Sequence, residues 1–339
     1  INSSSGNNTI SNNNISANQR GIRIYESQDN NITNNNISVT VTGINLDESS
    51  DNNIIYNNIF TETTGIILIS NSKNNTILDN NITVRNNYGI SMSANSDYND
   101  VIDNTINVTN NHAIDLSTSS NAFINNDLSA DSTVIRIQSG SGNTTFLNNN
   151  ITADDSKIIE DSTGASYDNY LIYNNSFGQI SWLDTENLTI IENGTLALGI
   201  IPIIANNSIF FNSSEIGSLN ESANISFYNT ENLNLETEWV FRNDASCPPA
   251  ICDVFSSGDT YGFNVSNISN YNYSIREFTP PCNVEINESG IINMTDDILN
   301  CVDDYIINIT ESDVVFDCQG YTINGTGSNG IYVYNADNV

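Results

Sequence analysis

A pattern of about 22 residues repeats through the first half of the chain, and it restricts the fold more than any other feature of the sequence. Each repeat, or row, holds three short segments in which apolar and polar residues alternate, separated by polar turns. Alternation with a period of two residues predicts strands. A strand triplet recurring roughly every 20–25 residues predicts a β-solenoid, whose coils stack about 4.8 Å apart around one aliphatic core. The rows begin at Gly21, Gly43, Gly65, Gly89, Ala113 and Val134.

One Asn recurs in every row, two residues before the Ile or Leu of the third segment. Asn tolerates the left-handed backbone conformation of a turn, and stacked side-chain amides can bond from coil to coil. We therefore predict an inward-facing Asn ladder. Its members are Asn13, Asn35, Asn57, Asn80, Asn104, Asn126 and Asn149.

The residue after the ladder Asn is often the Asn of an N-x-S/T sequon, and we predict that it points outward and carries a glycan. The chain contains 64 Asn among 339 residues, so many of its sequons arise by chance. The alternative is that these sequons are unused by-products of an Asn-rich turn. The candidate glycosylation sites are Asn14, Asn31, Asn36, Asn81, Asn107, Asn150, Asn187, Asn193, Asn224, Asn264 and Asn308.

The charge balance excludes two classes of partner. Forty acidic residues against eight basic ones give a net charge of −32, which argues against binding to nucleic acid or to an anionic membrane surface. The densest apolar stretch, 196–204, is too short to span a bilayer and contains Pro202, so we expect no membrane insertion. Five Cys and the many sequons indicate an extracellular or cell-surface location.

The repeat ends after Trp182, and we predict three domains: 1–182, 183–281 and 282–339. The middle segment has longer alternating runs separated by turns, which favours an antiparallel β-sandwich of immunoglobulin-like size. Within it, Cys247 and Cys252 are predicted to close a small disulfide loop. A metal site there is a weaker alternative, because no second Cys or His pair accompanies them.

The rows in 1–182, together with the segment from Asp313 to Ile323, resemble right-handed parallel β-helix proteins of the pectate-lyase-like repeat type, especially the Asn-rich versions of archaeal surface proteins. The resemblance implies that 282–339 is a capping segment followed by the opening coils of a second β-helix. It also implies a Cys282–Cys301 disulfide, with Cys318 as a buried free thiol. Pairing of Cys301 with Cys318 stays open.

Many β-helix proteins cleave or rearrange acidic polysaccharides. Such a site requires clustered carboxylates for acid–base chemistry, usually with a Lys or Arg side chain that binds the uronate. Asp79 and Asp103 occupy matching positions in neighbouring rows, as do Asp115 and Arg136. Neither pair combines several acids with a base, so turn and surface roles are favoured.

His112 is the only His, and we expect it to face solvent in a turn. We predict no catalytic residue, no metal site and no cofactor other than N-linked glycans. Calcium bound by the Asp pairs 296–297 and 303–304 stays an alternative.

Both chain ends fall within a row and neither has an evident cap. Open coil ends expose unpaired strand edges and core, which normally must be covered. We expect the tail of one unit to support the head of the next, either within one tandem polypeptide or between copies. A head-to-tail contact that does not close generates a filament. The alternative is a fragment with frayed ends.

Together these features predict an N-glycosylated structural subunit of an extracellular filament, sheath or surface layer, from a microbial and, by the resemblance, archaeal surface. Its partners would be copies of itself. Two other functions stay open: a carbohydrate-active enzyme (lyase, hydrolase or epimerase), and a glycan-binding adhesin that uses residues 183–281 as its binding head.

Overall fold

The structure is a computed structural model that forms two compact units, one made of residues 1–232 and 240–275, the other of 233–239 and 276–339. Each unit is treated by itself. The described residues are 1, 5–154, 157–163, 168–183, 189–192, 194–212, 217–230, 238–243, 245–248, 251–257, 260–268, 271–277, 282, 284–287, 289–294, 297–301, 305–326, 329–334 and 337.

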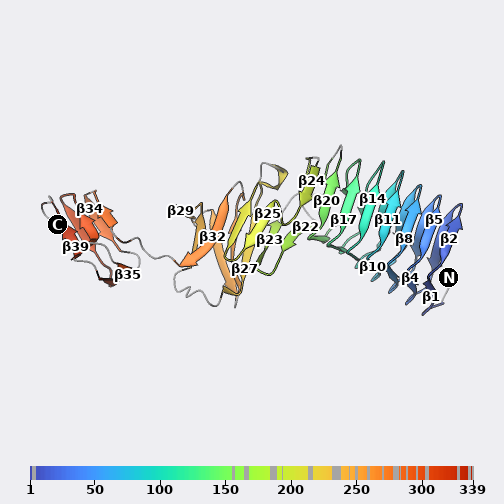
Figure 1. Cartoon of the computed structure of the whole chain (residues 1–339), viewed down its shortest axis with the longest axis horizontal. Coiled ribbons are helices and arrows are strands. Elements are labelled where there is room, and N and C mark those ends of the chain that lie inside the picture. Colours follow the sequence, from blue (N-terminus) through green and yellow to red (C-terminus); the bar gives the residue numbers. More distant parts are fainter. Residues whose placement is uncertain are drawn as a thin grey trace. The chain divides into compact units, whose positions relative to one another are not determined.

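The first 21 strands of the described chain repeat as seven triplets and build a parallel β-helix with three sheets, A, B and C (Figure 1). Sheet A contains β1 (Thr9–Ser11), β4 (Asn31–Thr33), β7 (Asn53–Ile55), β10 (Thr76–Leu78), β13 (Asp100–Ile102), β16 (Ala122–Ile124), β19 (Thr145–Leu147) and β22 (Tyr170–Asn174). Sheet B contains β2 (Asn14–Ala17), β5 (Asn36–Val39), β8 (Asn58–Thr61), β11 (Asn81–Val84), β14 (Thr105–Val108), β17 (Asp127–Ala130) and β20 (Asn150–Ala153). Sheet C contains β3 (Arg20–Tyr25), β6 (Thr42–Asp47), β9 (Thr64–Ile69), β12 (Tyr88–Ser93), β15 (Ile114–Ser117), β18 (Ile135–Ile137) and β21 (Ile159–Asp161).

The core of this helix is a set of aliphatic and aromatic columns. The strands of sheet A that precede β22 have three residues each, so only the middle residue can point inward. Ile54, Ile77 and Val101 occupy that position in successive coils and are fully buried. Further along, Phe123 and Phe146 stack with ring centroids 5.2 Å apart. The all-β solenoid predicted from the row pattern is confirmed.

Glycine begins four of the rows because the corner before sheet C leaves no room for a side chain. A Cβ on Gly65 would lie 2.4 Å from Cγ2 of Ile82 and 2.5 Å from the carbonyl oxygen of Gly89. Neither approach is tolerable for a real Cβ, and one of the two groups is backbone. The Gly column is therefore a packing requirement of the corner.

β22 still pairs in parallel with β19, and from β23 onward the pairing is antiparallel without a break in sheet A. β22 pairs with β23, and the sheet continues in the order β23, β27, β31 and β30, while β24 adds to sheet B. The remaining strands form a second antiparallel sheet, D, in the order β25, β26, β32, β28 and β29. The bounds are β23 (Gly178–Leu183), β24 (Gly194–Ala197), β25 (Pro202–Ala205), β26 (Ser208–Phe211), β27 (Ala223–Tyr228), β28 (Glu238–Arg242), β29 (Ala245–Ser246), β30 (Cys252–Ser257), β31 (Thr260–Val265), β32 (Asn272–Glu277) and the 3₁₀ helix η1 (Gly217–Leu219).

Large buried side chains hold this antiparallel region together. Trp182 packs against Phe211 and donates its indole N–H to the carbonyl oxygen of Leu219 at 3.2 Å. Phe263 packs against Phe227 and Tyr273. The boundary expected at 182 therefore falls inside a continuous sheet and inside one compact unit, and the immunoglobulin-like topology of 183–281 stays a prediction.

The second compact unit contains short parallel strands that pair like stacked coils, in three sheets. Its strands are β33 (Val284–Ile286), β34 (Gly290–Asn293), β35 (Ile298–Cys301), β36 (Tyr305–Ile309), β37 (Val314–Asp317), β38 (Ile323–Gly325) and β39 (Asn329–Val333). Ile286, Met294, Ile298 and Ile309 are among the side chains that form its core. No helix long and apolar enough to cross a membrane occurs among the described residues.

Candidate functional site

The predicted Asn column forms a continuous hydrogen-bonded ladder along the turn between sheets A and B. Asn57 shows the geometry: its backbone N–H and its Nδ2 both donate to Oδ1 of Asn80, at 2.9 and 3.0 Å. Nδ2 of Asn57 also donates to the carbonyl oxygens of Ile32 and Ile55. Each amide thus joins its own turn to the next coil. The same links connect Asn13, Asn35, Asn57, Asn80, Asn104, Asn126 and Asn149 in order.

The left-handed residue of this turn is the one before the ladder Asn. Asn34, Tyr56 and Asp79 have φ values of 56°, 55° and 53°. The ladder Asn follows and is free to turn its side chain inward. The expected left-handed role of the ladder Asn is therefore wrong. The left-handed position before the ladder Asn requires Asn, Asp or a strained larger residue. The ladder position requires a side-chain amide that can both donate and accept hydrogen bonds.

Two further ladders run parallel to the first, at the corner before sheet A. Asn30 Nδ2 donates to Asn52 Oδ1 at 2.9 Å, and the links continue through Asn75, Asn99 and Asn121. Nearby, the backbone N–H of one buried Ser donates to Oγ of the next, through Ser27, Ser49, Ser72 and Ser96. The sequence does carry the signal for the second Asn ladder, because these Asn also stand two residues before an inward apolar residue.

The second ladder is interrupted at one coil. Thr144 occupies the position after Asn121, and its buried Oγ1 has no hydrogen-bond partner among the described residues. Its backbone N–H still donates to Oδ1 of Asn169 at 3.1 Å. Thr has no amide to accept from Asn121 and donate onward, so the chain of side-chain bonds stops there.

The predicted glycosylation sites differ in accessibility. Asn14, Asn36, Asn81, Asn107 and Asn150 are exposed, whereas Asn31 and Asn264 are half-buried. The amide oxygens of Asn224 and Asn308 are buried, with no hydrogen-bond partner in the described part of the chain. Asn36 Nδ2 donates to Asn14 Oδ1 at 3.1 Å, so these two side chains already bond across adjacent coils. Asn187 and Asn193 lie outside the described residues.

A cluster of polar side chains covers the outer face of sheet C, which we call the sheet C cluster: Tyr88, His112, Asp115, Arg136 and Gln138. Arg136 Nε donates to Asp115 Oδ1 at 2.7 Å, and Arg136 Nη2 donates to the Tyr88 hydroxyl at 3.0 Å. Gln138 Nε2 donates to both oxygens of Asp115, at 2.9 and 3.1 Å. Asp115 is thus buried with all of its charge compensated by neighbours.

His112 is buried in this cluster with 7% of its surface exposed, so the expectation that it faces solvent is wrong. Its ring stacks on Tyr88 at 6.0 Å, and Nδ1 lies 2.5 Å from the carbonyl oxygen of Thr133. Burial, aided by the positive charge of Arg136, lowers the pKa of His112. The hydrogen bond with Asp115 raises the pKa of Arg136. The site therefore pairs a neutral imidazole with a fixed guanidinium.

The other sequence-predicted acids lie apart from this cluster. Asp79 and Asp103 occupy the left-handed turn position, each with φ of 53°. Among the described residues, no group of three or more His, Cys, Asp and Glu side chains could hold a metal ion. Of the residues named for calcium, positions 296, 303 and 304 lie outside the described part of the chain.

Half of the basic side chains form ion pairs with an acidic residue of the neighbouring coil. Arg23–Asp47, Lys73–Asp97, Arg85–Glu62 and Arg136–Asp115 are ion pairs between neighbouring coils, with N–O distances from 2.7 to 3.2 Å. Such partly exposed pairs contribute at most about 1 kcal/mol each. Four of the eight basic residues are nevertheless held this way.

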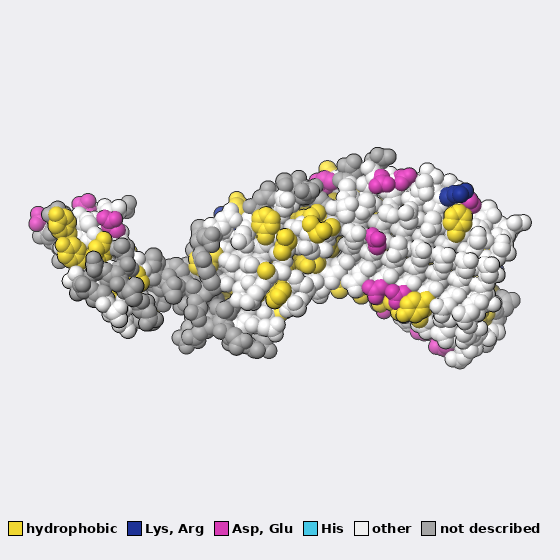
Figure 2. All heavy atoms as spheres, viewed as in Figure 1, with side chains coloured by type: hydrophobic (Ala, Val, Ile, Leu, Met, Phe, Trp, Pro, Cys, Tyr) yellow, Lys and Arg dark blue, Asp and Glu magenta, His cyan; other side chains and the backbone are white. Residues whose placement is uncertain are grey.

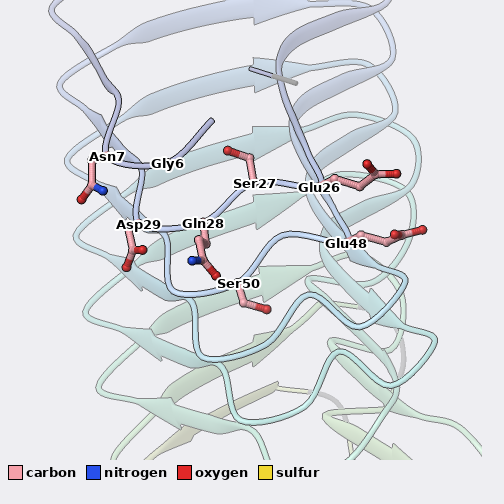
Figure 3. A pocket seen from close by; sticks show the side chains of 8 residues that line it. All are labelled: Gly6, Asn7, Glu26, Ser27, Gln28, Asp29, Glu48 and Ser50. Carbon is pink, nitrogen blue, oxygen red and sulfur yellow. The ribbon is translucent and has the colours of Figure 1, made fainter. Parts of the chain in front are cut away.

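The N-terminal coils also carry an acidic hollow of about 550 Å³ (Figure 3). Glu26 and Glu48 lie on successive coils at its border and point to the same side, while Asp29 lines the opposite part. This arrangement concentrates negative charge at the surface.

The structure contains two disulfides, Cys247–Cys252 and Cys282–Cys301. Cys318 is a free thiol, and it is partly rather than fully buried. The second disulfide joins the start of the second compact unit to strand β35, whose Cys301 belongs to the core of that unit.

Comparison with known proteins agrees with the coil architecture. The sequence profile of the "Right handed beta helix region" family matches residues 1–106. No characterised protein matches the sequence significantly. Together with the stacked parallel coils, the profile match defines a right-handed β-helix repeat protein.

Solved structures with a similar arrangement include two point mutants of the periplasmic alginate epimerase AlgG, at 21% and 22% identity and TM-scores of 0.36 and 0.37. Each alignment covers 45% of this chain and 35% of the epimerase, so the chain spans about a third of that protein. ORF18 of Geobacillus virus E2 is 10% identical over 83% of this chain and 62% of its own, with a TM-score of 0.33.

Proposed function

We propose that this chain is a structural subunit of an extracellular filament, sheath or surface layer, assembled from copies of itself. The observation that carries the proposal is the repetition of the same inter-coil bonds along the helix axis. Each coil of the first ladder receives two hydrogen bonds on one Asn Oδ1 and gives two to the next. A coil surface of this kind is complementary to any other coil of the same repeat.

Strands β1 and β2 are the end strands of their sheets, and another coil could pair with them there. The apolar side chains of the first described coil, Ile10 and Ile15, are only half-buried, whereas their equivalents Ile32 and Ile37 are fully covered. A coil stacked on that edge, from preceding residues of a longer polypeptide or from another copy, would complete the aliphatic columns. Unpaired edges and exposed core favour such addition.

Charge and disulfides support an extracellular structural role as well. A net charge of −32 would keep the assembled protein soluble outside its contact surfaces. Two disulfides suit an oxidising compartment. N-linked glycans at exposed sequons such as Asn81 and Asn150 would add to that solubility, and an archaeal cell surface is the source that the resemblance suggests.

Negative-stain electron microscopy of the full chain and two single variants tests this function. Ile15→Lys places a charge in the open core of β2, whereas Ser16→Lys places the same charge on the exposed face of the same strand. We expect rods longer than one chain for the unmodified protein and for Ser16→Lys, and only single particles for Ile15→Lys. Single particles of the unmodified protein at high concentration would contradict the proposal.

The sheet C cluster favours a second function, carbohydrate modification on a uronate polymer. A neutral His112 beside the Tyr88 hydroxyl and the Arg136 guanidinium provides a base, an acid and a carboxylate-binding group within one surface. Turnover of polyuronates, measured by new unsaturated products or by a change in epimer content, would support this function if His112→Gln and Tyr88→Phe abolish it. Absence of turnover in the unmodified protein would remove it.

A further inference from the structure

A group of large apolar side chains lies exposed on the antiparallel region of the first compact unit. Phe177, Ile200, Ile203 and Phe210 are 45%, 73%, 47% and 45% exposed. Figure 2 shows hydrophobic side chains gathered over the part of the molecule where β23 and β25 lie in Figure 1. We call these four residues the uncharged face.

The four residues belong to elements that are bonded to one another. Ile203 and Phe210 are cross-strand partners in the hairpin of β25 and β26. The turn between β22 and β23 reaches the same hairpin, because Asn175 Nδ2 donates to the carbonyl oxygen of Ile204 at 2.9 Å. Asn175 Oδ1 in turn accepts from the N–H of Phe177 at 2.9 Å. The turn and the hairpin therefore form one surface.

This surface is built from strands that lack charge. The sequences of β22 to β27 and of β31 contain no Asp, Glu, Lys or Arg. Elsewhere the chain is strongly acidic, with a net charge of −32. Two copies repel each other through their carboxylates, and burying an unpaired carboxylate is expensive. An apolar face without carboxylates is where two copies approach with the least electrostatic opposition.

Strand addition at β25 is a poor alternative for this surface. β25 is the edge strand of sheet D, but it begins with Pro202, which has no N–H to donate. The carbonyl oxygen of Ile204 is already bonded to Asn175. With these two groups blocked, the edge offers few bonds to an incoming strand. A partner would therefore contact the exposed apolar side chains of this surface rather than the edge of β25.

We propose that the uncharged face binds the same face of a second copy of this chain, across a two-fold axis. The same patch then serves both partners, as in an isologous interface. This lateral contact would act in addition to the axial contact between coil ends. Its biological role rests on the proposed structural function. Rods joined in this way form a sheet or sheath rather than separate filaments.

Sedimentation velocity over a range of concentrations tests the lateral contact. The double variant Ile203→Ser/Phe210→Ser removes two apolar anchors, and Val41→Ser, at a similarly exposed residue of the coil region, is the matched control. All chains also carry Ile15→Lys, so that axial stacking is suppressed. We expect a reversible dimer for the parent and the control, and a dimer at least about tenfold weaker for the double variant.

The outcomes separate this inference from the proposed function. A parent chain that stays monomeric at every concentration overturns the lateral contact, whether the face is covered by residues 276–339 of the same chain or binds another partner. Equal dimerisation of the parent and the double variant also overturns it. Rods that require Ile15 would still support the axial function in either case. Equal thermal midpoints for all variants verify that each one is folded.

Discussion

Replacing one ladder Asn should destabilise one turn of the β-helix. Replacing the exposed residue that follows it should have little effect on stability. Asn80 is 2% exposed, and its Oδ1 accepts from the backbone N–H and from Nδ2 of Asn57. Its own Nδ2 donates to Asn104 Oδ1 and to the carbonyl oxygens of Ile54 and Leu78. Leu at position 80 would keep the volume and remove every one of these bonds.

The magnitude follows from the donors left without an acceptor. A buried unsatisfied donor costs about 1–3 kcal/mol. In this variant the backbone N–H of Asn57 loses its acceptor, Oδ1 of residue 80. Nδ2 of Asn57 keeps the carbonyl oxygens of Ile32 and Ile55 as acceptors. We therefore expect Asn80→Leu to destabilise the coil by about 1–3 kcal/mol. Asn81→Leu, on the exposed side of the same turn, should stay within about 0.5 kcal/mol.

Hydrogen exchange measures this difference at the coil itself. Native-state exchange reports the opening free energy of individual amides, and the amide of Asn57 is the one whose acceptor is removed. Faster exchange over residues 55–59 in Asn80→Leu, with the rate of the unmodified chain retained in Asn81→Leu, is the expected result. Equal protection in both variants would refute the structural role of the ladder.

Three other perturbations have defined outcomes. Thr144→Asn should restore the link with Asn121 and raise stability by about 1 kcal/mol, and an unchanged or lower urea midpoint would contradict this. Gly65→Ala should lower the thermal midpoint strongly, because its Cβ would lie 2.4 Å from Ile82 Cγ2, and a midpoint equal to that of the unmodified chain would show that the corner can yield. The pKa of His112 is lowered from 6.5 in the fold, so the unfolded chain takes up that proton first as the pH falls. Stability should therefore decrease below about pH 6.5, and His112→Gln should reduce the decrease; an identical pH profile for both chains would argue against the buried neutral imidazole.

The coil architecture could be predicted because its determinants are local and repeated. Each row contains its own alternation and its own turn Asn, and four rows also have a corner Gly, so seven imperfect copies reinforce one pattern. The second Asn ladder has the same spacing to an inward residue as the first, and Asn30 and Asn52 therefore carried a readable signal. The assignment of the left-handed position to the ladder Asn failed because adjacent Asn residues at 34 and 35 are indistinguishable in type, although their backbones differ.

The sheet C cluster could not be predicted from any one row. Tyr88 and Arg136 are 48 residues apart and meet only because two coils bring them to one face. His112 stands in a polar turn by sequence, and it is buried because Tyr88 of the preceding row stacks on its ring. The continuation of sheet A into β23 is equally non-local, because the pairing of β22 with β23 and β27 depends on strands that share no repeat.

Cryo-electron microscopy of the full chain at high concentration tests the central claim most directly. Stacking of one chain on the next through complementary coils predicts filaments whose power spectra contain a strong layer line near 4.8 Å, unbroken across the junction between chains. Particles of one-chain length only, or filaments whose junctions lack continuous coil stacking, would contradict a structural subunit that assembles end to end.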